Sequence, residues 1–470
     1  MVYGKVARRL LIYRADKEKG GNGAMDQEAI IRLIQSEMKP GMGCTEPAAI
    51  GLAVSNTCGR LNLPAAKIHL KLSSNIFKNA FCVKIPNTDK AGIPLAAALG
   101  ALLAGRDNTM ELFSRVTAEL TEEAEKMLKH GIITLEVEPD NRFYIEVTAS
   151  AGQEAVRTIT LDRHDNLVYI EKGGKILLDR RNGHNVDSYG GEVWITESSI
   201  CDLVDICEKI PVEEIAFLKE GIEMNRLAAQ MGLSRSYGLN IGKKIRGMVK
   251  KGVLPDDLAS FVKMNVAAAC DCRMGGAPLS AMTVLGSGNQ GFEAILLPAS
   301  AAEYLGCGEE KMLRSVMMSI LLTIRIKYHV GRLSPICGAT LSGAAGAGAV
   351  VWLMGGSREQ IEGAIQNMLG SVSGMLCDGA KDGCALKLGN CAGEAVLAAS
   401  LAIEGSIIRQ TDGIISCRVE ETIRNVARLS REGMSGVDMN IISIMLSKES
   451  MAAGENASVT AVSGRPAKVS

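Results

Sequence analysis

The chain has 470 residues, of which 47% are hydrophobic and 22% are charged. This is enough apolar material for a globular core and more length than one domain usually has, so we expect two domains. The 52 basic residues balance the 52 acidic ones, so the chain as a whole offers no electrostatic footprint for nucleic acid or for an anionic membrane surface. We therefore expect a small-molecule substrate, no nucleic-acid partner and no membrane partner.

The 13 cysteines are an odd number, and no secretory signal opens the chain. A disulfide framework is therefore not expected. The sequence predicts a cytoplasmic protein whose reduced thiols are available as buried apolar residues, nucleophiles or metal ligands. The longest uncharged apolar runs, such as 341–356, are shorter than the ~20 residues that a membrane-spanning helix needs.

The start of the core has the pattern of two short helices. The first helix is predicted to be capped by Asp26 and to run to Pro40. A second helix is expected over 48–58 with Pro47 in its first turn, which places Cys44 close to a helix N-terminus.

Strands are predicted next along the chain. Alternating apolar and polar residues indicate one strand that begins at Lys67 and further strands over 133–137, 144–147 and 156–161. The polar segment from Asn75 to Asn79 is expected to be a loop after the first strand.

From about Ser198 the pattern changes to helical periodicity with glycine clusters between the helices. The predicted fold class is α+β, with a mixed α/β N-terminal domain and a mainly α-helical C-terminal domain. The predicted division is an extension over 1–24, the mixed domain over 25–197, the helical domain over 198–450 and a tail over 451–470.

Three cysteines stand apart from the other ten. Cys337 follows a helix break, and Cys377 and Cys384 flank one glycine-rich segment. Glycine permits backbone conformations that let such a segment wrap closely around a cofactor. Cys384 also lies where a helix is predicted to begin, a position that lowers a thiol pKa. The pattern predicts a cofactor held by three thiolates.

The number of candidate cysteine ligands indicates which kind of cofactor they would hold. Cys391 lies seven residues beyond Cys384, a helical rise of roughly 10 Å, so we interpret it as a core residue. Three thiolates without a fourth suggest an iron–sulfur cluster with one open iron, which acts as a Lewis acid toward a leaving group. Three ordinary buried cysteines remain an alternative. Zinc is disfavoured because no paired C-x2-C or nearby histidine accompanies the triad, and His329 is interpreted as a packed or surface residue.

Four segments, taken together with the triad, carry a resemblance to a known family. The chain resembles the L-cysteine desulfidases that work without pyridoxal phosphate, which are relatives of the α-subunit of iron–sulfur L-serine dehydratases. The resemblance runs from Met25 to about Lys448 and rests on 43–47, 75–79, 286–291, 331–334 and the three cysteines. It implies a [4Fe–4S] cluster on Cys337, Cys377 and Cys384, no pyridoxal phosphate, and Cys44 in the active site. An open iron is easily oxidised, so purification in air can strip the cluster.

The reaction implied by the resemblance is β-elimination of sulfide from L-cysteine, which yields pyruvate and ammonia. A base must take the α-proton while a Lewis acid holds the leaving sulfur. Cys44 is one candidate base, because a helix start would help its thiol to ionise. Lys78 is the other, and it would need burial or a nearby positive charge to lower its pKa.

The zwitterionic substrate needs donors for its carboxylate and acceptors for its ammonium. The predicted binding residues are Asn75, Asn79, Ser287, Asn289, Gln290 and Arg332. Their alternative roles are a capping cluster for the first pair, a plain loop for the next three and a solvated charge for the arginine. Cys270 and Cys272 are interpreted as packing residues near the pocket.

Two hypotheses of different classes follow. The first is a [4Fe–4S] lyase that acts on L-cysteine, with L-serine as the nearest alternative substrate. The second is a non-enzymatic iron–sulfur sensor or binding protein that uses the same three cysteines. Glycine- and alanine-rich helix faces would permit a homo-oligomer.

Overall fold

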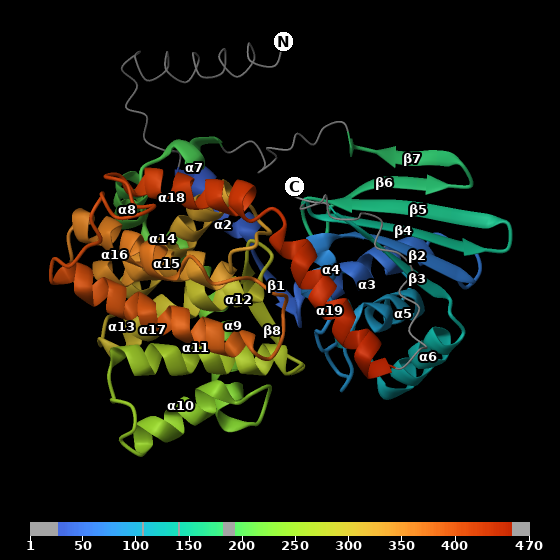
Figure 1. Ribbon diagram of the computed structural model, residues 1–470, viewed down its shortest axis with the longest axis horizontal. Helices are drawn as coiled ribbons and strands as arrows, with labels where there is room; N and C mark the ends of the chain where they lie inside the picture. The colour runs from blue at the N-terminus through green and yellow to red at the C-terminus, as the bar shows by residue number, and fades with distance from the viewer. Residues whose placement is uncertain (1–26, 106–107, 140–141, 182–192, 454–470) are drawn as a thin grey trace, which may run out of the picture.

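The computed structural model describes residues 27–105, 108–139, 142–181 and 193–453. The predicted extension over 1–24, the Asp26 cap and the tail beyond residue 453 lie outside these residues. Figure 1 shows a sheet with a few helices on one side of the molecule and a large helical bundle on the other. The predicted α+β class is therefore confirmed, whereas the predicted domain boundaries stay a prediction.

The sheet has six strands in the order β3-β2-β4-β5-β6-β7. The β2 and β3 strands are parallel, and the other neighbouring pairs are antiparallel. All four predicted strand regions lie in it. The bounds are β2 Lys67–Ser73, β3 Ile133–Glu138, β4 Tyr144–Ala151, β5 Glu154–Leu161, β6 Leu167–Lys172 and β7 Lys175–Asp179.

One face of this sheet packs on helices to form a core. Because side chains alternate along a strand, the apolar positions of β2 and β4 reach the same core as those of α3. The helices of this part are α3 Thr45–Cys58, α4 Ser74–Ala80, α5 Ile93–Leu102, the short η1 Leu112–Arg115 and α6 Ala118–Lys129.

The bundle begins beyond residue 192 and forms the largest core. Its helices approach closely at glycines: a Cβ on Gly232 of α9 would lie 2.0 Å from the Ala268 carbonyl oxygen of α11, so no larger residue fits. The elements are α7 Val193–Glu197, α8 Ile200–Lys209, η3 Val212–Ile215, α9 Leu218–Ser234, α10 Ile241–Lys250, α11 Leu258–Met274, α12 Gly288–Gly291, η4 Phe292–Leu296, α13 Leu297–Tyr304, α14 Glu309–Val330, α15 Gly338–Leu353, α16 Arg358–Val372, α17 Cys384–Ile403, α18 Val419–Arg428, η5 Leu429–Gly433 and α19 Val437–Ala453.

Two local predictions were wrong. The first helix, α2 Gln27–Glu37, ends before Pro40, which lies in the strand β1 Met38–Met42. Within the described residues this strand pairs with β8 Ser280–Val284 alone, and a two-stranded ribbon has free edges at which proline is tolerated. Asn75 to Asn79 form part of the helix α4 and not a loop. Ile76 and Phe77 are fully buried there, so the backbone has to satisfy its own polar groups within the segment.

The last helix connects the two parts of the molecule. Figure 1 shows α19 lying beside α4, away from the rest of the bundle. Its Asp438 carboxylate accepts a hydrogen bond from Lys78 Nζ at 2.5 Å, and neither side chain is more than 1% exposed. Ile442 of α19 is buried in the core beneath the sheet. The C-terminal helix thereby completes the N-terminal core.

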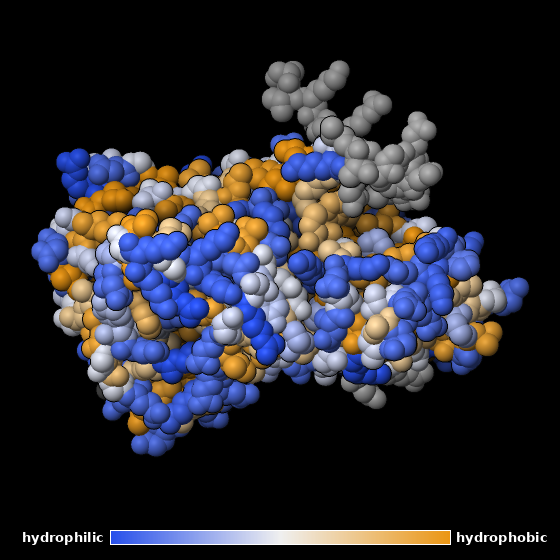
Figure 2. Space-filling view, turned by 90° about the horizontal axis from the view of Figure 1, so that it is seen from below, coloured by the Kyte–Doolittle hydropathy of each residue, from blue (hydrophilic) through white to orange (hydrophobic). Residues whose placement is uncertain are grey.

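Among the described helices, α17 alone has the length and hydropathy of a membrane span, and half of that stretch is buried inside the bundle. It packs on α11, α15 and α16, which is the arrangement of a core helix. Figure 2 shows hydrophilic and hydrophobic side chains interspersed over the underside of the molecule.

The buried ion pair predicts the effect of removing one partner. Lys78→Met leaves the Asp438 carboxylate buried without its cation, so we expect the free energy of unfolding to fall by about 3–5 kcal/mol in urea denaturation. Lys219→Met removes a comparable but exposed pair with Glu309 and should change the free energy of unfolding by less than about 1 kcal/mol. Equal effects of the two substitutions would contradict the structural role of the Lys78 pair.

Candidate active site

A cleft of about 720 Å³ lies between the two parts of the molecule. The N-terminal part contributes the start of α3 and the end of α4. The bundle contributes the α12 turn, α14 and the two segments that contain Cys337 and Cys377 to Cys384. Nine of the eleven predicted site residues line it: Cys44, Asn79, Ser287, Asn289, Gln290, Arg332, Cys337, Cys377 and Cys384.

Backbone pairing brings the three distant cysteines to this cleft. The Cys337 N–H donates to the Met375 carbonyl at 2.9 Å, and the Cys377 N–H donates to the Pro335 carbonyl at 2.7 Å. The two segments therefore lie side by side. Cys384 follows as the first residue of α17, and Cys337 is the N-cap of α15. These two hydrogen bonds bring together segments whose cysteines, Cys337 and Cys377, are 40 residues apart in the sequence.

The segment from Cys377 to Cys384, called the cysteine segment below, also packs on the N-terminal part. Gly379, between Cys377 and Cys384, has φ +88°, and a Cβ there would lie 2.4 Å from the Lys78 carbonyl oxygen of α4. Only glycine combines this conformation with this close approach. Asn79, the next residue of α4, consequently has its Oδ1 3.8 Å from the Cys377 sulfur.

Burial raises the pKa of two of the three thiols. It raises the pKa of Cys337 to about 12, with Cys377 and Cys384 adding to the shift. Burial also raises the pKa of Cys384, although Lys381 opposes it. The expectation that a helix start lowers the pKa of Cys384 was therefore wrong. Metal binding would have to displace thiol protons, as is usual for cysteine ligands.

Cys44 and Glu46, which belong to the N-terminal part of the molecule, form a hydrogen-bonded pair in the cleft. Cys44 is the N-cap of α3, and its Sγ donates to Glu46 Oε2 at 3.2 Å. Thr45 Oγ1 donates to the same oxygen at 3.0 Å, and Asn79 Nδ2 donates to Oε1 at 3.1 Å. Glu46 is 7% exposed, so its carboxylate is held by three protein donors at the edge of the cleft.

The protonation of this pair differs from the prediction. Burial, followed by the nearby Glu46 carboxylate, raises the pKa of Cys44 well above its ordinary value. Burial alone would raise the pKa of Glu46, but His164, the Cys44 thiol and Arg273 lower it below its ordinary value. Cys44 is consequently a neutral hydrogen-bond donor, and Glu46 is the ionised group. Glu46 was not predicted, although an acidic residue in the first turn after Cys44 was a visible signal.

Two cations of the cleft were also not predicted. Arg273 at the end of α11 donates from Nη1 to Asn289 Oδ1 at 2.9 Å. Lys327 of α14 is 1% exposed, and burial lowers its pKa to about 8 despite the opposing effect of Cys377. Both lie in helical stretches without a recognisable motif, so only the packing of α11 and α14 reveals them.

The polar turn of α12 is more than a plain loop. Ser287 caps α12 by accepting a hydrogen bond from the Gln290 N–H, and Gln290 Nε2 donates to the Val284 carbonyl. A Cβ on Gly338 would lie 2.4 Å from Gln290 Oε1, so this turn packs directly on the start of α15. Arg332 is an ion-paired residue and not a solvated charge, since its Nη2 donates to Glu37 Oε1 at 2.8 Å.

Two predicted residues do not line the cleft. Lys78 is buried in its ion pair with Asp438, which argues against its role as the base. Asn75 is buried within α4. Cys391 also lies outside the cleft, with its Sγ 3.8 Å from Met375 Sδ. Cys270 is buried with its Sγ 3.7 Å from Asn289 Oδ1, which places it next to the cleft.

Comparison with known proteins gives one family. The model of the serine dehydratase alpha chain family matches residues 107–443. A UPF0597 protein of Bacteroides fragilis is 37% identical over 425 residues, which cover 90% of this chain and 99% of that protein. A UPF0597 protein of Clostridium botulinum is 37% identical over 419 residues, which cover 89% and 96%.

This chain belongs to the serine dehydratase alpha chain family. The family is one of lyases and is generally associated with iron–sulfur clusters. The names of the UPF0597 relatives state no activity.

The cleft fits such a cluster by the chemistry of its donors. Among residues 27–105, 108–139, 142–181 and 193–453, no group of three His, Cys, Asp or Glu side chains is arranged for a single metal ion. Cys337, Cys377 and Cys384 are free thiols in one cleft. A cubane takes each thiolate on a separate iron, so its ligands surround a larger volume than those of one ion. Cys337, Cys377 and Cys384 are the residues that would hold such a cluster.

His164 lies behind Glu46 and has a strongly shifted pKa. It is 7% exposed in the turn between β5 and β6, with its ring against Phe143 at a centroid distance of 4.7 Å. Burial lowers the pKa of His164 from 6.5 to about 4, and Arg332 adds to this while Glu46 opposes it. The imidazole is thus neutral at pH 7.

The shift of His164 predicts a pH-dependent stability. The unfolded chain binds a proton on this histidine below pH 6.5, whereas the folded chain binds it only near pH 4. The contribution of His164 to the free energy of unfolding is therefore fully present above about pH 6.5. It falls by about 3 kcal/mol as the pH drops to about 4. His164→Gln should lack this component when urea denaturation is compared at both pH values. A parallel loss in the variant and the parent would refute it.

Proposed function

We propose that the protein is an iron–sulfur-dependent lyase that eliminates sulfide from L-cysteine and releases pyruvate and ammonia. The observation that carries this proposal is the presence of three free thiols, Cys337, Cys377 and Cys384, in one cleft with the hydrogen-bonded Cys44 and Glu46. These thiols would hold a [4Fe–4S] cluster without pyridoxal phosphate. A bound cluster would supply a Lewis acid for the leaving sulfur.

Glu46 is the base in this proposal. Its lowered pKa keeps it ionised at neutral pH, and its three donors fix the carboxylate. The α-proton of the substrate would pass to Glu46 either directly or through the Cys44 thiol, which gives its own proton to Oε2 as it receives the new one. Since general-base catalysis needs a positioned acceptor, the protonated Cys44 is better suited to a relay than to the role of base.

The cleft also offers groups for the two charges of the amino acid. Arg273 and Lys327 are cations that can pair with the carboxylate. Asn79 donates its amide to Glu46, which leaves its Oδ1 facing the Cys377 side of the cleft as an acceptor for the ammonium. A zwitterionic amino acid carries one charge for each set of groups.

L-serine is the alternative substrate, and the family of the chain favours it, because the matching family is named for serine dehydratase. A hydroxyl would then leave in place of sulfide from the same cleft. A non-enzymatic sensor would use the cysteines but would give Glu46, Arg273 and Lys327 no task. We therefore propose the enzyme, acting in the cytoplasm, over the sensor.

A matched pair of cysteine variants tests the cluster ligands. After anaerobic reconstitution with iron and sulfide, the parent protein should form pyruvate from L-cysteine, with L-serine assayed in parallel. Cys377→Ser should lower both bound iron and the rate by about 10²-fold or more, because it removes a ligand. Cys391→Ser changes a buried cysteine outside the cleft and should retain iron and activity. Full activity in Cys377→Ser would sink the proposal, and faster turnover of L-serine would select the dehydratase.

Glu46 and Cys44 can be separated by substitution. Glu46→Gln keeps the shape but removes the base, so kcat should fall by about 10²–10⁴-fold while bound iron is unchanged. Cys44→Ser keeps a hydroxyl that can donate to Glu46, so kcat should fall much less. The opposite order, with Cys44→Ser inactive and Glu46→Gln near the parent rate, would make Cys44 the base.

A further inference from the structure

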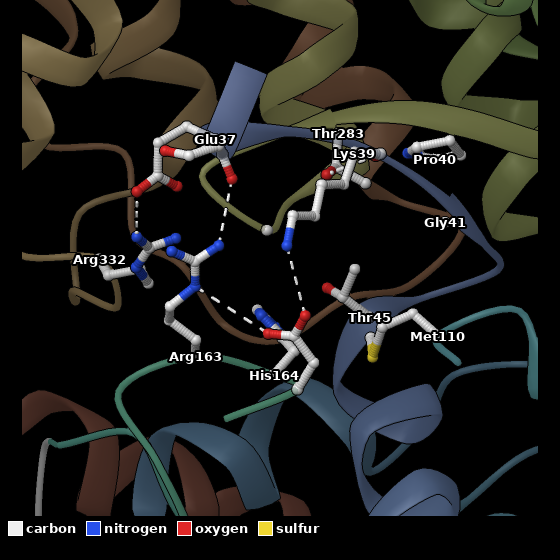
Figure 3. A pocket seen from close by; sticks show the side chains of 13 residues that line it. Glu37, Lys39, Pro40, Gly41, Thr45, Met110, Arg163, His164, Thr283 and Arg332 are labelled. Atoms are coloured by element: carbon white, nitrogen blue, oxygen red, sulfur yellow. Dashed lines mark hydrogen bonds and ion pairs between the residues drawn. The ribbon is translucent and has the colours of Figure 1, made fainter. Parts of the chain in front are cut away.

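A second cavity of about 430 Å³ lies next to the cleft and shares only Thr45 and Arg332 with it. Its walls come from the ribbon of β1 and β8, the turn between β5 and β6, and the loops at Gly286 and Arg332. Figure 3 shows the side chains of Lys39, Arg163 and Arg332 directed into this space above His164.

His164 provides a buried polar atom without a partner. Its Nε2 has no hydrogen-bond partner within the described residues, and the side chain is 7% exposed. The ring is fixed from two sides, by Phe143 and by Gly286, where a Cβ would lie 2.6 Å from ring atoms. Leaving a buried polar atom unpaired is costly, so this fixed imidazole indicates a binding group for a ligand.

Both acidic and basic side chains line the cavity, and two of their ion pairs are long and partly exposed. Lys39 Nζ lies 3.4 Å and Arg163 Nε 4.0 Å from the same carboxylate, that of Asp165. These side chains are 36–51% exposed, so they can exchange partners at little cost. The shorter Arg332–Glu37 pair forms the wall toward the cleft. Two cations facing one anion leave a place for a further carboxylate.

We propose that this cavity is a binding site for a small zwitterionic amino acid, additional to the cleft. The ligand carboxylate pairs with Lys39 and Arg163, whose side chains share Asp165 in its absence. The ligand ammonium donates to the neutral Nε2 of His164 and to Asp165. Because Arg332 and Thr45 line both spaces, the ligand lies directly beside the cleft. This inference goes beyond the elimination chemistry and does not depend on it.

Isothermal titration of the full chain with L-alanine tests the site, because L-alanine is a zwitterion without a leaving group and does not react. Lys39→Ala should weaken binding by roughly tenfold or more through loss of a charge-assisted contact. His164→Asn, which retains only the position of Nδ1, should also weaken it, whereas His164→Gln retains a polar atom near Nε2 and should bind as the parent. Lys175→Ala removes a remote exposed charge on β7 and should change nothing.

Three outcomes would overturn the proposal. The first is no L-alanine binding to the parent protein at about 10 mM, far above the working range of a specific site. The second is binding that Arg273→Ala in the cleft abolishes and Lys39→Ala leaves intact. The third is equal affinity for L-lactate, which lacks the ammonium. If the histidine variants do not fold, Lys39→Ala and L-lactate still decide. Absence of pyruvate formation would refute the lyase and leave this result unaffected.

Discussion

The packing of α4 against the glycine-rich cysteine segment is the contact on which the cleft depends. The Lys78 carbonyl lies so close to Gly379 that no side chain fits between them. This contact brings Asn79 to the Cys377 sulfur and, through Asn79, connects the cysteines to Glu46. The Lys78 side chain meanwhile binds Asp438 of α19. One short helix therefore joins the N-terminal core, the cysteine segment and the C-terminal helix.

Burial decides the chemistry of the groups that meet there. Cys337, Cys384 and Cys44 have raised pKa values because their charged form is poorly solvated. Glu46 stays ionised because Cys44, Thr45 and Asn79 donate to it. Sites that move protons commonly contain a neighbouring acid and base whose pKa values are shifted in opposite directions. The second cavity extends this polar region toward His164 and the ribbon of β1 and β8.

The fold class and most of the strands followed from local pattern, since side-chain alternation is a property of the chain itself. The errors arose where tertiary burial overrides local polarity. Asn75 to Asn79 have the composition of a loop, yet burial of Ile76 and Phe77 makes the segment helical. Pro40 has the usual effect on a helix, but its place in a strand depends on β8, which follows about 240 residues later.

The sequence by itself determined which residue types are available for chemistry: three spaced cysteines with glycines between two of them, a cysteine at a helix start and polar turns. It also predicted, from helical rise, that Cys391 does not join them. Tertiary structure alone decided that Glu46, Arg273 and Lys327 face the same cleft, that Lys78 is used in an ion pair, and that burial raises the pKa values of Cys44 and Cys384. The physical reason is that proximity and desolvation depend on the packing of distant segments, whereas helix rise and strand alternation are fixed by neighbours in the chain.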